Sequence, residues 1–216
     1  MQGIGEGLQM TTYFPERMCC PRCDHGFSYM AVGSYNTFGA TFTDGYIEGP
    51  MYDDQGRLFR CPHCHAVGWN DEFACEDPDD GDEAELGSVF DAEAGPIPLK
   101  DYPALLDAAP WRGPDEEKYV RIAAFWAANM PRRGAPESTE PFSASEERNL
   151  RALLERLDDS PQDRLMRAEI LRETGQFEAC LEVLAGFEDE DLETVARLIR
   201  TLAMGRDARV VAVPQG

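Results

Sequence analysis

The chain has 216 residues and a formal net charge of −21, because 41 acidic residues face only 20 basic ones, 18 of them arginine. A surface of that sign repels nucleic acid phosphates and anionic membranes, so we expect neither as a partner. No stretch approaches the roughly 18 consecutive apolar residues of a membrane span, and residues 1–13 lack the basic and apolar regions of a signal peptide.

Two cysteine pairs mark the N-terminal part, Cys20-Pro21-Arg22-Cys23 and Cys61-Pro62-His63-Cys64. The C-x₂-C spacing lets one tight turn direct both sulfurs at a single ion. Two such turns supply the four soft ligands of a closed tetrahedral site. The residue after each pair commonly needs a positive φ, and Asp24 and His65 are of types that tolerate it. We therefore predict a structural Zn²⁺ site formed by Cys20, Cys23, Cys61 and Cys64.

Other ligand sets remain open at this point. Cys19 adjoins Cys20 and is an alternative ligand, and the chain's three histidines (His25, His63 and His65) all lie beside the cysteines. Iron in place of zinc would make the domain a rubredoxin-like electron carrier. We expect Cys75 and Cys180 to be ordinary cysteines. This cysteine usage favours a reducing cytoplasm over a disulfide framework.

Strands are predicted on both sides of a long insert. Phe27–Val32 and Arg57–Arg60 have strand composition, and the segment from Tyr35 to Tyr46 mixes β-formers with turn residues, including the tight-turn dipeptide Asp44-Gly45. Strands flanked by C-x₂-C pairs have the layout of a zinc ribbon. We predict such a ribbon over residues 1–75, with Tyr35–Tyr46 as an extended hairpin insert whose role is unexplained. A core this small gains from a metal crosslink.

The middle part, residues 76–113, is acidic and contains several prolines. The acidic run 76–83 invites comparison with a calcium-binding EF-hand loop. Placing Gly81 at the required sixth position puts Pro78 at a ligand position and Gly87 at the last one, so the comparison fails. We predict a solvated linker over 76–113.

The C-terminal part, residues 114–216, is predicted to be an all-α domain, which makes the chain an α+β protein. Apolar residues recur at helical spacing in five segments. The second begins with the capping box Ser143-x-x-Glu146, and the third begins with Ser160 before Pro161. The predicted helices are 115–130, which Pro131 ends, then 143–157, 161–174, 177–185 and 191–204.

The sequence from Ala168 to Leu184 resembles a tetratricopeptide repeat. That family has a small residue within the first helix, a glycine and an aromatic residue at the turn, and a small residue on the second helix. These roles are matched in order by Ala168, Gly175, Phe177 and Cys180. The similarity covers about residues 161–186, and Arg164 stands where the family has an aromatic residue. The whole chain resembles an uncharacterised type of bacterial protein with an N-terminal zinc ribbon and a tetratricopeptide-like tail, a resemblance that implies no activity.

Catalytic motifs are missing from the sequence. It contains no zinc deaminase signature, no His-Glu-x-x-His, no Gly-x-Ser-x-Gly, no phosphate-binding loop and no dinucleotide fingerprint. We therefore assign no catalytic residue and expect a zinc-stabilised, cytoplasmic adaptor that presents its helical hairpins to another protein. The ribbon offers only four arginines and no lysine over residues 1–70, which disfavours nucleic acid binding.

Two alternatives to the adaptor stay open. One is an enzyme with an unrecognised site in the aromatic hairpin, around Tyr35–Gly39 and Thr43–Gly45. The other is an acidic inhibitor or immunity-type protein that masks a basic partner, which a charge of −21 permits. The identity of the partner and the oligomeric state do not follow from the sequence.

Overall fold

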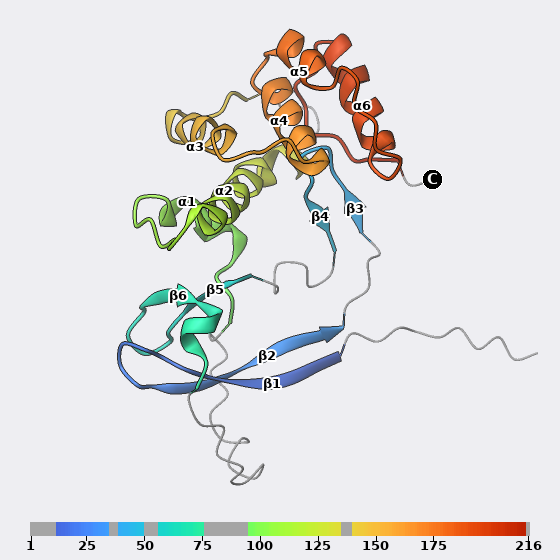
Figure 1. Cartoon of the computed structure of the whole chain (residues 1–216). Helices are drawn as coiled ribbons and strands as arrows, with labels where there is room; N and C mark the ends of the chain where they lie inside the picture. Colours follow the sequence, from blue (N-terminus) through green and yellow to red (C-terminus); the bar gives the residue numbers. More distant parts are fainter. Residues whose placement is uncertain (1–11, 35–38, 50–55, 76–94, 135–139, 215–216) are drawn as a thin grey trace, which may run out of the picture. The chain divides into compact units, whose positions relative to one another are not determined.

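The computed structural model describes residues 12–34, 39–49, 56–75, 95–134 and 140–214 (Figure 1). They form two compact units, one within Met1–Gly39 and Gly49–Pro98, the other within Ala40–Glu48 and Leu99–Gly216. Antiparallel strands with the cysteine pairs precede a series of helices, so the predicted α+β class is confirmed. The boundaries differ from the prediction in two places: residues 40–48 belong to the helical unit rather than the ribbon, and so do residues 99–113, which we had placed in the linker.

The ribbon unit consists of two antiparallel hairpins. The first pairs Met18 with Phe27, and the second pairs Leu58 with Trp69. The predicted strands 27–32 and 57–60 are both present, whereas their partners were not predicted. The elements are β1 (Thr12–Cys19), β2 (Gly26–Ser34), β5 (Leu58–Arg60), β6 (Val67–Trp69) and the 3₁₀ helix η2 (Asn70–Phe73).

A small aromatic core holds these hairpins together. Phe27 and Phe59 both pack on Phe73, with ring centroids 5.9 and 6.4 Å apart. The chain returning toward the helices closes the core, because the Ile97 amide donates to the Leu58 carbonyl at 2.7 Å. So few buried side chains give a marginal domain, and the cysteine pairs add the crosslinks that it needs.

The helical unit follows the predicted pattern closely. Ser143 forms its capping box with Glu146, and Ser160 caps the helix that starts at Pro161. Gly175 has a φ of +76° where that helix stops. The elements are η3 (Leu99–Asp101), α1 (Tyr102–Leu105), α2 (Pro114–Gly134), α3 (Ala144–Leu154), α4 (Pro161–Glu173), α5 (Phe177–Val183) and α6 (Glu193–Met204).

Helix α2 continues through Pro131, so the prediction that Pro131 ends it is wrong. A proline within a helix leaves the carbonyl four residues earlier without its amide donor. Guanidinium groups supply donors to the carbonyls on either side of that position. Arg132 donates to the Ala128 carbonyl and Arg133 to the Trp126 carbonyl, each at 2.7 Å. The two contacts are made on either side of the Ala127 carbonyl, the one that Pro131 leaves without its amide donor, and they tie the side chains of Arg132 and Arg133 to the last turns of α2.

The hairpin formed by β3 (Ala40–Thr41) and β4 (Ile47–Glu48) lies against the helices of its unit (Figure 1). Its tip is the predicted Asp44-Gly45 turn, with a φ of +80° at Gly45. The chain after α6 forms backbone hydrogen bonds with this hairpin: the Thr43 amide donates to the Val211 carbonyl, and the Val213 amide donates to the Thr41 carbonyl. We call residues 40–48 the docked hairpin.

The tip of the docked hairpin enters a buried polar cluster. Asp44, 1% exposed, accepts from the Arg133 guanidinium and, at 3.1 Å, from the amide of Asn129. The same Asn129 amide donates to both oxygens of Glu173, and Arg172 pairs with Glu169 where neither side chain is exposed. The cluster comprises three carboxyl groups (Asp44, Glu169 and Glu173) and two guanidinium groups (Arg133 and Arg172).

One bound proton would make this cluster neutral, and Glu173 is its best site. Burial raises the pKa of Glu173 well above its ordinary value, and the neighbouring carboxylates of Glu169 and Asp44 raise it further. Burial also raises the pKa of Asp44, but there Arg133 and the Tyr46 amide oppose the rise. We therefore assign the proton to Glu173.

Replacing Glu173 by glutamine should flatten the pH dependence of unfolding. Below the unfolded-state pKa of about 4.3, Glu173 is protonated in both states. Above it, only the unfolded chain releases the proton, so wild-type stability falls by about 1.4 kcal/mol per pH unit until the folded pKa is reached. Both proteins should be unfolded with a chemical denaturant between pH 5 and 7. The free energy of unfolding of the variant, relative to that of the wild type, should increase as the pH rises. A constant difference would mean that Glu173 is ionised in the folded protein.

Candidate metal centre

Each cysteine pair forms the turn of an antiparallel hairpin. The first turn joins β1 to β2, and the second joins β5 to β6. The two turns have corresponding backbone hydrogen bonds. The Cys20 amide donates to the His25 carbonyl at 3.0 Å, and the Cys61 amide donates to the Ala66 carbonyl at 2.9 Å. Asp24 and His65 then donate back to the carbonyls of Cys20 and Cys61. Two turns of the same kind thus direct their cysteine sulfurs toward one another.

The residue after each pair adopts the predicted left-handed conformation. The φ angle is 56° at Asp24 and 58° at His65. Aspartate and histidine tolerate this region better than most residues other than glycine. Within each turn, before the residue of positive φ, one backbone amide points at a sulfur. The backbone amide of Arg22 donates to Cys20 Sγ, and the backbone amide of Cys64 donates to Cys61 Sγ, both at 3.4 Å.

The structure brings the four predicted cysteines into one cluster. Their Sγ atoms all lie within 4.8 Å of one another, and the pairs Cys20–Cys64 and Cys23–Cys61 are 3.7 Å apart. Sulfurs at about 2.3 Å from a tetrahedral metal are about 3.8 Å from each other. The spacing therefore fits a single tetrahedral ion bound by Cys20, Cys23, Cys61 and Cys64.

Electrostatics also indicates that the cluster needs a cation. Burial raises the pKa of Cys20. At Cys23 the backbone contact with His25 lowers the pKa, but burial and the neighbouring thiols outweigh it and raise the pKa to about 12. Only Cys64, helped first by the backbone at Ala66, has a lowered pKa, about 7. Four thiolates at these distances repel one another, and a bound cation removes that penalty.

The neighbouring histidines lie outside the cluster of ligand atoms in the described residues. His25 and His63 stack on each other instead, with ring centroids 4.9 Å apart and ring planes 19° apart. One histidine comes from each turn, so the stacked pair adds a contact between the two turns. Neither the histidines nor Cys19 is needed to complete the ligand set.

Cys19 and Cys75 form a disulfide, which corrects the expectation that Cys75 is an ordinary cysteine and removes Cys19 as an alternative ligand. The bond joins the end of β1 to the segment after η2, where Met18 and Ala74 also form a β-bridge. This pairing was missed because 56 residues separate the two cysteines and only the folded ribbon brings them together. The ribbon therefore has a covalent crosslink one residue from a metal-site cysteine.

The hairpin that we considered as a possible enzyme site is partly outside the described residues, since 35–38 are not among them. The two polar side chains at its tip are buried: Thr43 is 3% exposed and Asp44 1%. Asp44 is fully engaged with Arg133, Asn129 and the Tyr46 amide. The exposed acid of the docked hairpin is Glu48 at the end of β4, away from the buried Thr43–Asp44 tip, so the tip itself presents no free acid or base.

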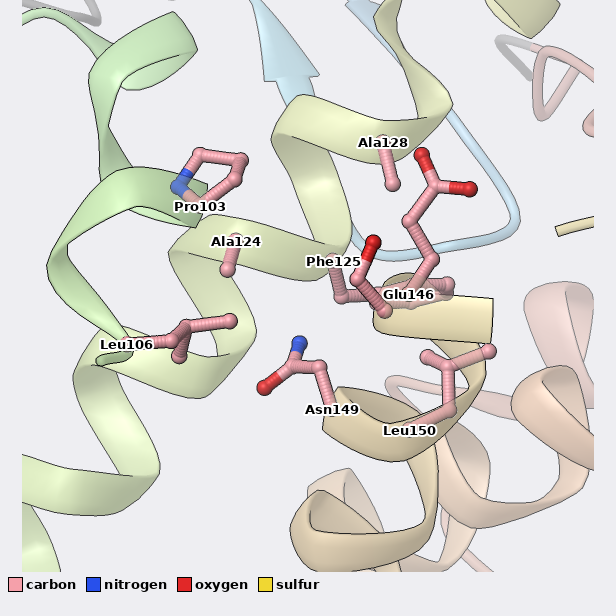
Figure 2. A pocket seen from close by; sticks show the side chains of 9 residues that line it. Pro103, Leu106, Ala124, Phe125, Ala128, Glu146, Asn149 and Leu150 are labelled. Atoms are coloured by element: carbon pink, nitrogen blue, oxygen red, sulfur yellow. The ribbon is translucent and has the colours of Figure 1, made fainter. Parts of the chain in front are cut away.

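An apolar cavity elsewhere in the helical unit is equally poor as a catalytic site (Figure 2). It lies between α1, α2 and α3 and has a volume of about 70 Å³, well below the 300 Å³ or more typical of small-molecule sites. The polar side chains at its wall already have partners. Glu146 accepts from the Ser143 amide, and Asn149 donates to the Arg121 carbonyl.

Comparison with protein-family models, with curated proteins and with solved structures finds no match.

Metal content should depend on the four clustered cysteines and not on the other thiols. The purified protein should contain one equivalent of metal, and Cys20→Ser or Cys61→Ser should retain less than a tenth of it, because three thiolates leave the ion open to water and chelators. Cys180→Ala, in the helical core, is the matched control and should keep the full equivalent. Elemental analysis after exhaustive dialysis measures this. Equal metal content in all four proteins would contradict the site.

The disulfide should be visible in a thiol count. If the protein is alkylated in denaturant with a chelator and no reductant, five thiols should react, those of Cys20, Cys23, Cys61, Cys64 and Cys180. Prior reduction should raise the count to seven. Peptide mapping should recover the Cys19 and Cys75 peptides as a linked pair. Seven reactive thiols without reductant would show that the pair is open in solution.

Proposed function

We propose that this chain is a zinc-stabilised protein-interaction adaptor with no catalytic site of its own. The observation that carries the proposal is the four-cysteine cluster: an ion held by all four sulfurs has no open position for water or substrate. Such an ion stabilises a fold and exposes no reactive ligand. The buried tip of the hairpin and the small apolar cavity are consistent with this, because the polar side chains at both places already have partners within the protein.

Zinc is the metal that we propose. A ribbon of two hairpins with four thiolates is a common setting for structural Zn²⁺, which has no redox chemistry and accepts tetrahedral sulfur without strain. Iron in the same ligands would make an electron carrier, and the protein would be coloured. A colourless protein with one equivalent of zinc supports the structural role.

We also propose that α4 and α5 act as a tetratricopeptide-like helical pair. Ala168 and Cys180 are fully buried, and Phe177 is 8% exposed in the same core, as small and aromatic residues of such a repeat should be. Helix α6 packs on both helices, which a single repeat requires because it cannot bury its own faces. Pairs of this kind commonly serve as protein-binding scaffolds.

The partner that we propose is another protein with basic surface regions. A net charge of −21 attracts such a partner over distances of about a Debye length. Exposed apolar side chains on the ribbon hairpin would supply the short-range contact: Phe14 is 48% and Met30 47% exposed. Phe14 is paired with Ala31 and Met30 with Pro15, so the two side chains lie on opposite faces of the hairpin and each would contact the partner separately.

The proposed compartment is the cytoplasm, because thiolate ligands must stay reduced to hold a metal. No helix in the described part of the chain is both long and apolar enough to cross a membrane. The Cys19–Cys75 disulfide is the opposing observation, since such bonds are rare in reducing compartments. The proposal therefore requires that this disulfide be resistant to cellular reductants.

A capture experiment in salt tests the adaptor role. The immobilised chain should retain a partner through a 1 M salt wash, because charge attraction is then screened beyond about 3 Å and apolar contact remains. Replacing Phe14 and Met30 by alanine should reduce capture at least tenfold. Arg151→Ala, which removes an exposed ion pair on α3, is the matched control and should capture as wild type does.

Two results would argue against the adaptor. Release of the partner at about 0.5 M salt, with no effect of the alanine replacements, would favour the acidic inhibitor that masks a basic protein. Turnover of a substrate by the purified chain would favour the enzyme.

A further inference from the structure

The docked hairpin is an integral part of the helical unit. Trp126 donates to the Asp44 carbonyl at 3.0 Å, and the side chain of Arg133, only 6% exposed, pairs with the Asp44 carboxylate. If the hairpin left, Arg133 would keep a buried charge without its carboxylate partner, and Trp126 would lose its acceptor. Removing one partner of a buried ion pair is strongly destabilising. The helical unit therefore needs the hairpin.

The hairpin nevertheless belongs, by sequence, to the metal-binding segment. Residues 40–48 lie between Cys23 and Cys61, so the chain runs from one pair of metal-site cysteines through the hairpin to the other pair. The path from the hairpin to the first helix then passes through residues 49–98, which belong to the ribbon unit. Folding of the ribbon consequently sets the length of the tether that holds the hairpin near its helices.

The tether is short only when the ribbon is folded. In the folded ribbon the Ile97 amide donates to the Leu58 carbonyl, and Phe59 forms a β-bridge with Pro96. These contacts hold residues 58 and 97 together, so residues 59–96 no longer add to the length of the tether. The tether then shrinks from about 50 residues to about 10. Because the probability of loop closure falls with about the 3/2 power of loop length, the shorter tether favours docking about tenfold.

We propose that metal binding at the four cysteines controls docking of the 40–48 hairpin, and through it the stability of the helical unit. The metal folds the ribbon, the folded ribbon shortens the tether, and the shorter tether keeps Asp44 on Arg133. The four cysteines and the Asp44 cluster are thus two linked sites in one chain. This coupling does not depend on the adaptor role, because it requires no partner.

Amide hydrogen exchange tests the coupling in the full chain. The Val213 and Thr43 amides donate across the hairpin contact, to the carbonyls of Thr41 and Val211, so their exchange reports docking directly. Both amides should exchange about tenfold faster in the Cys20→Ser protein, or after removal of Zn²⁺ by a chelator, than in the Zn²⁺-loaded wild type. In the Asp44→Ala protein, the Val213 and Thr43 amides should exchange fast both with and without Zn²⁺.

Two insertions separate tether length from any loss of folding. Twenty Gly/Ser residues inserted between Gly49 and Gly56 lengthen the short tether about threefold, so Val213 should exchange about fivefold faster even with Zn²⁺ bound. The same insert after Asp80 lies in the bypassed stretch and should change nothing in the Zn²⁺ form.

The coupling is overturned if Val213 and Thr43 exchange at unchanged rates when the metal is removed and the β5–β6 amides lose their protection. It is equally overturned if the two insertions have the same effect. Neither result depends on whether a partner is captured, so failure of the coupling and failure of the adaptor role are distinguishable.

Discussion

Repulsion among four sulfur ligands is the constraint on which the ribbon depends. Two identical turns place the Sγ atoms of Cys20, Cys23, Cys61 and Cys64 within 4.8 Å of one another. Without a cation these groups cannot all be thiolates, and with one they form a closed tetrahedron. The aromatic core around Phe27, Phe59 and Phe73 is too small to hold the hairpins firmly by itself. An ion bound by the four cysteines would supply one missing crosslink, and the Cys19–Cys75 disulfide beside them supplies another.

A second polar interaction organises the helical unit, and it uses a residue from the insert. Asp44 meets Arg133 and Asn129 in a cluster shared with Glu173. Buried charges of this kind contribute less to net stability than apolar packing, but they permit only one arrangement of their elements. Because Asp44 lies in the sequence between the two cysteine pairs, the chain crosses between its two units three times. The metal site and the polar cluster are therefore covalently linked.

Features that follow from local rules were predictable from the sequence, and those that depend on distant partners were not. The C-x₂-C turns, the positive φ at Asp24 and the cap at Ser143 depend on a few neighbouring residues. The destination of the docked hairpin was not predictable, because Asp44 finds Arg133 across 89 residues of sequence. The same holds for Cys19 with Cys75. The continuation of α2 through Pro131 was not predictable either, because the contacts of Arg132 and Arg133 with the nearby carbonyls of Ala128 and Trp126 appear only in the folded helix.

We propose that the ribbon binds a single ion through four sulfurs and no other ligand. X-ray absorption at the zinc edge measures this directly on the purified protein. The account predicts a first shell of four sulfurs at about 2.3 Å, with no nitrogen or oxygen ligand. A shell with one or more nitrogens, from His25, His63 or His65, or with an oxygen from water, would contradict it, since the site would then be open or differently built.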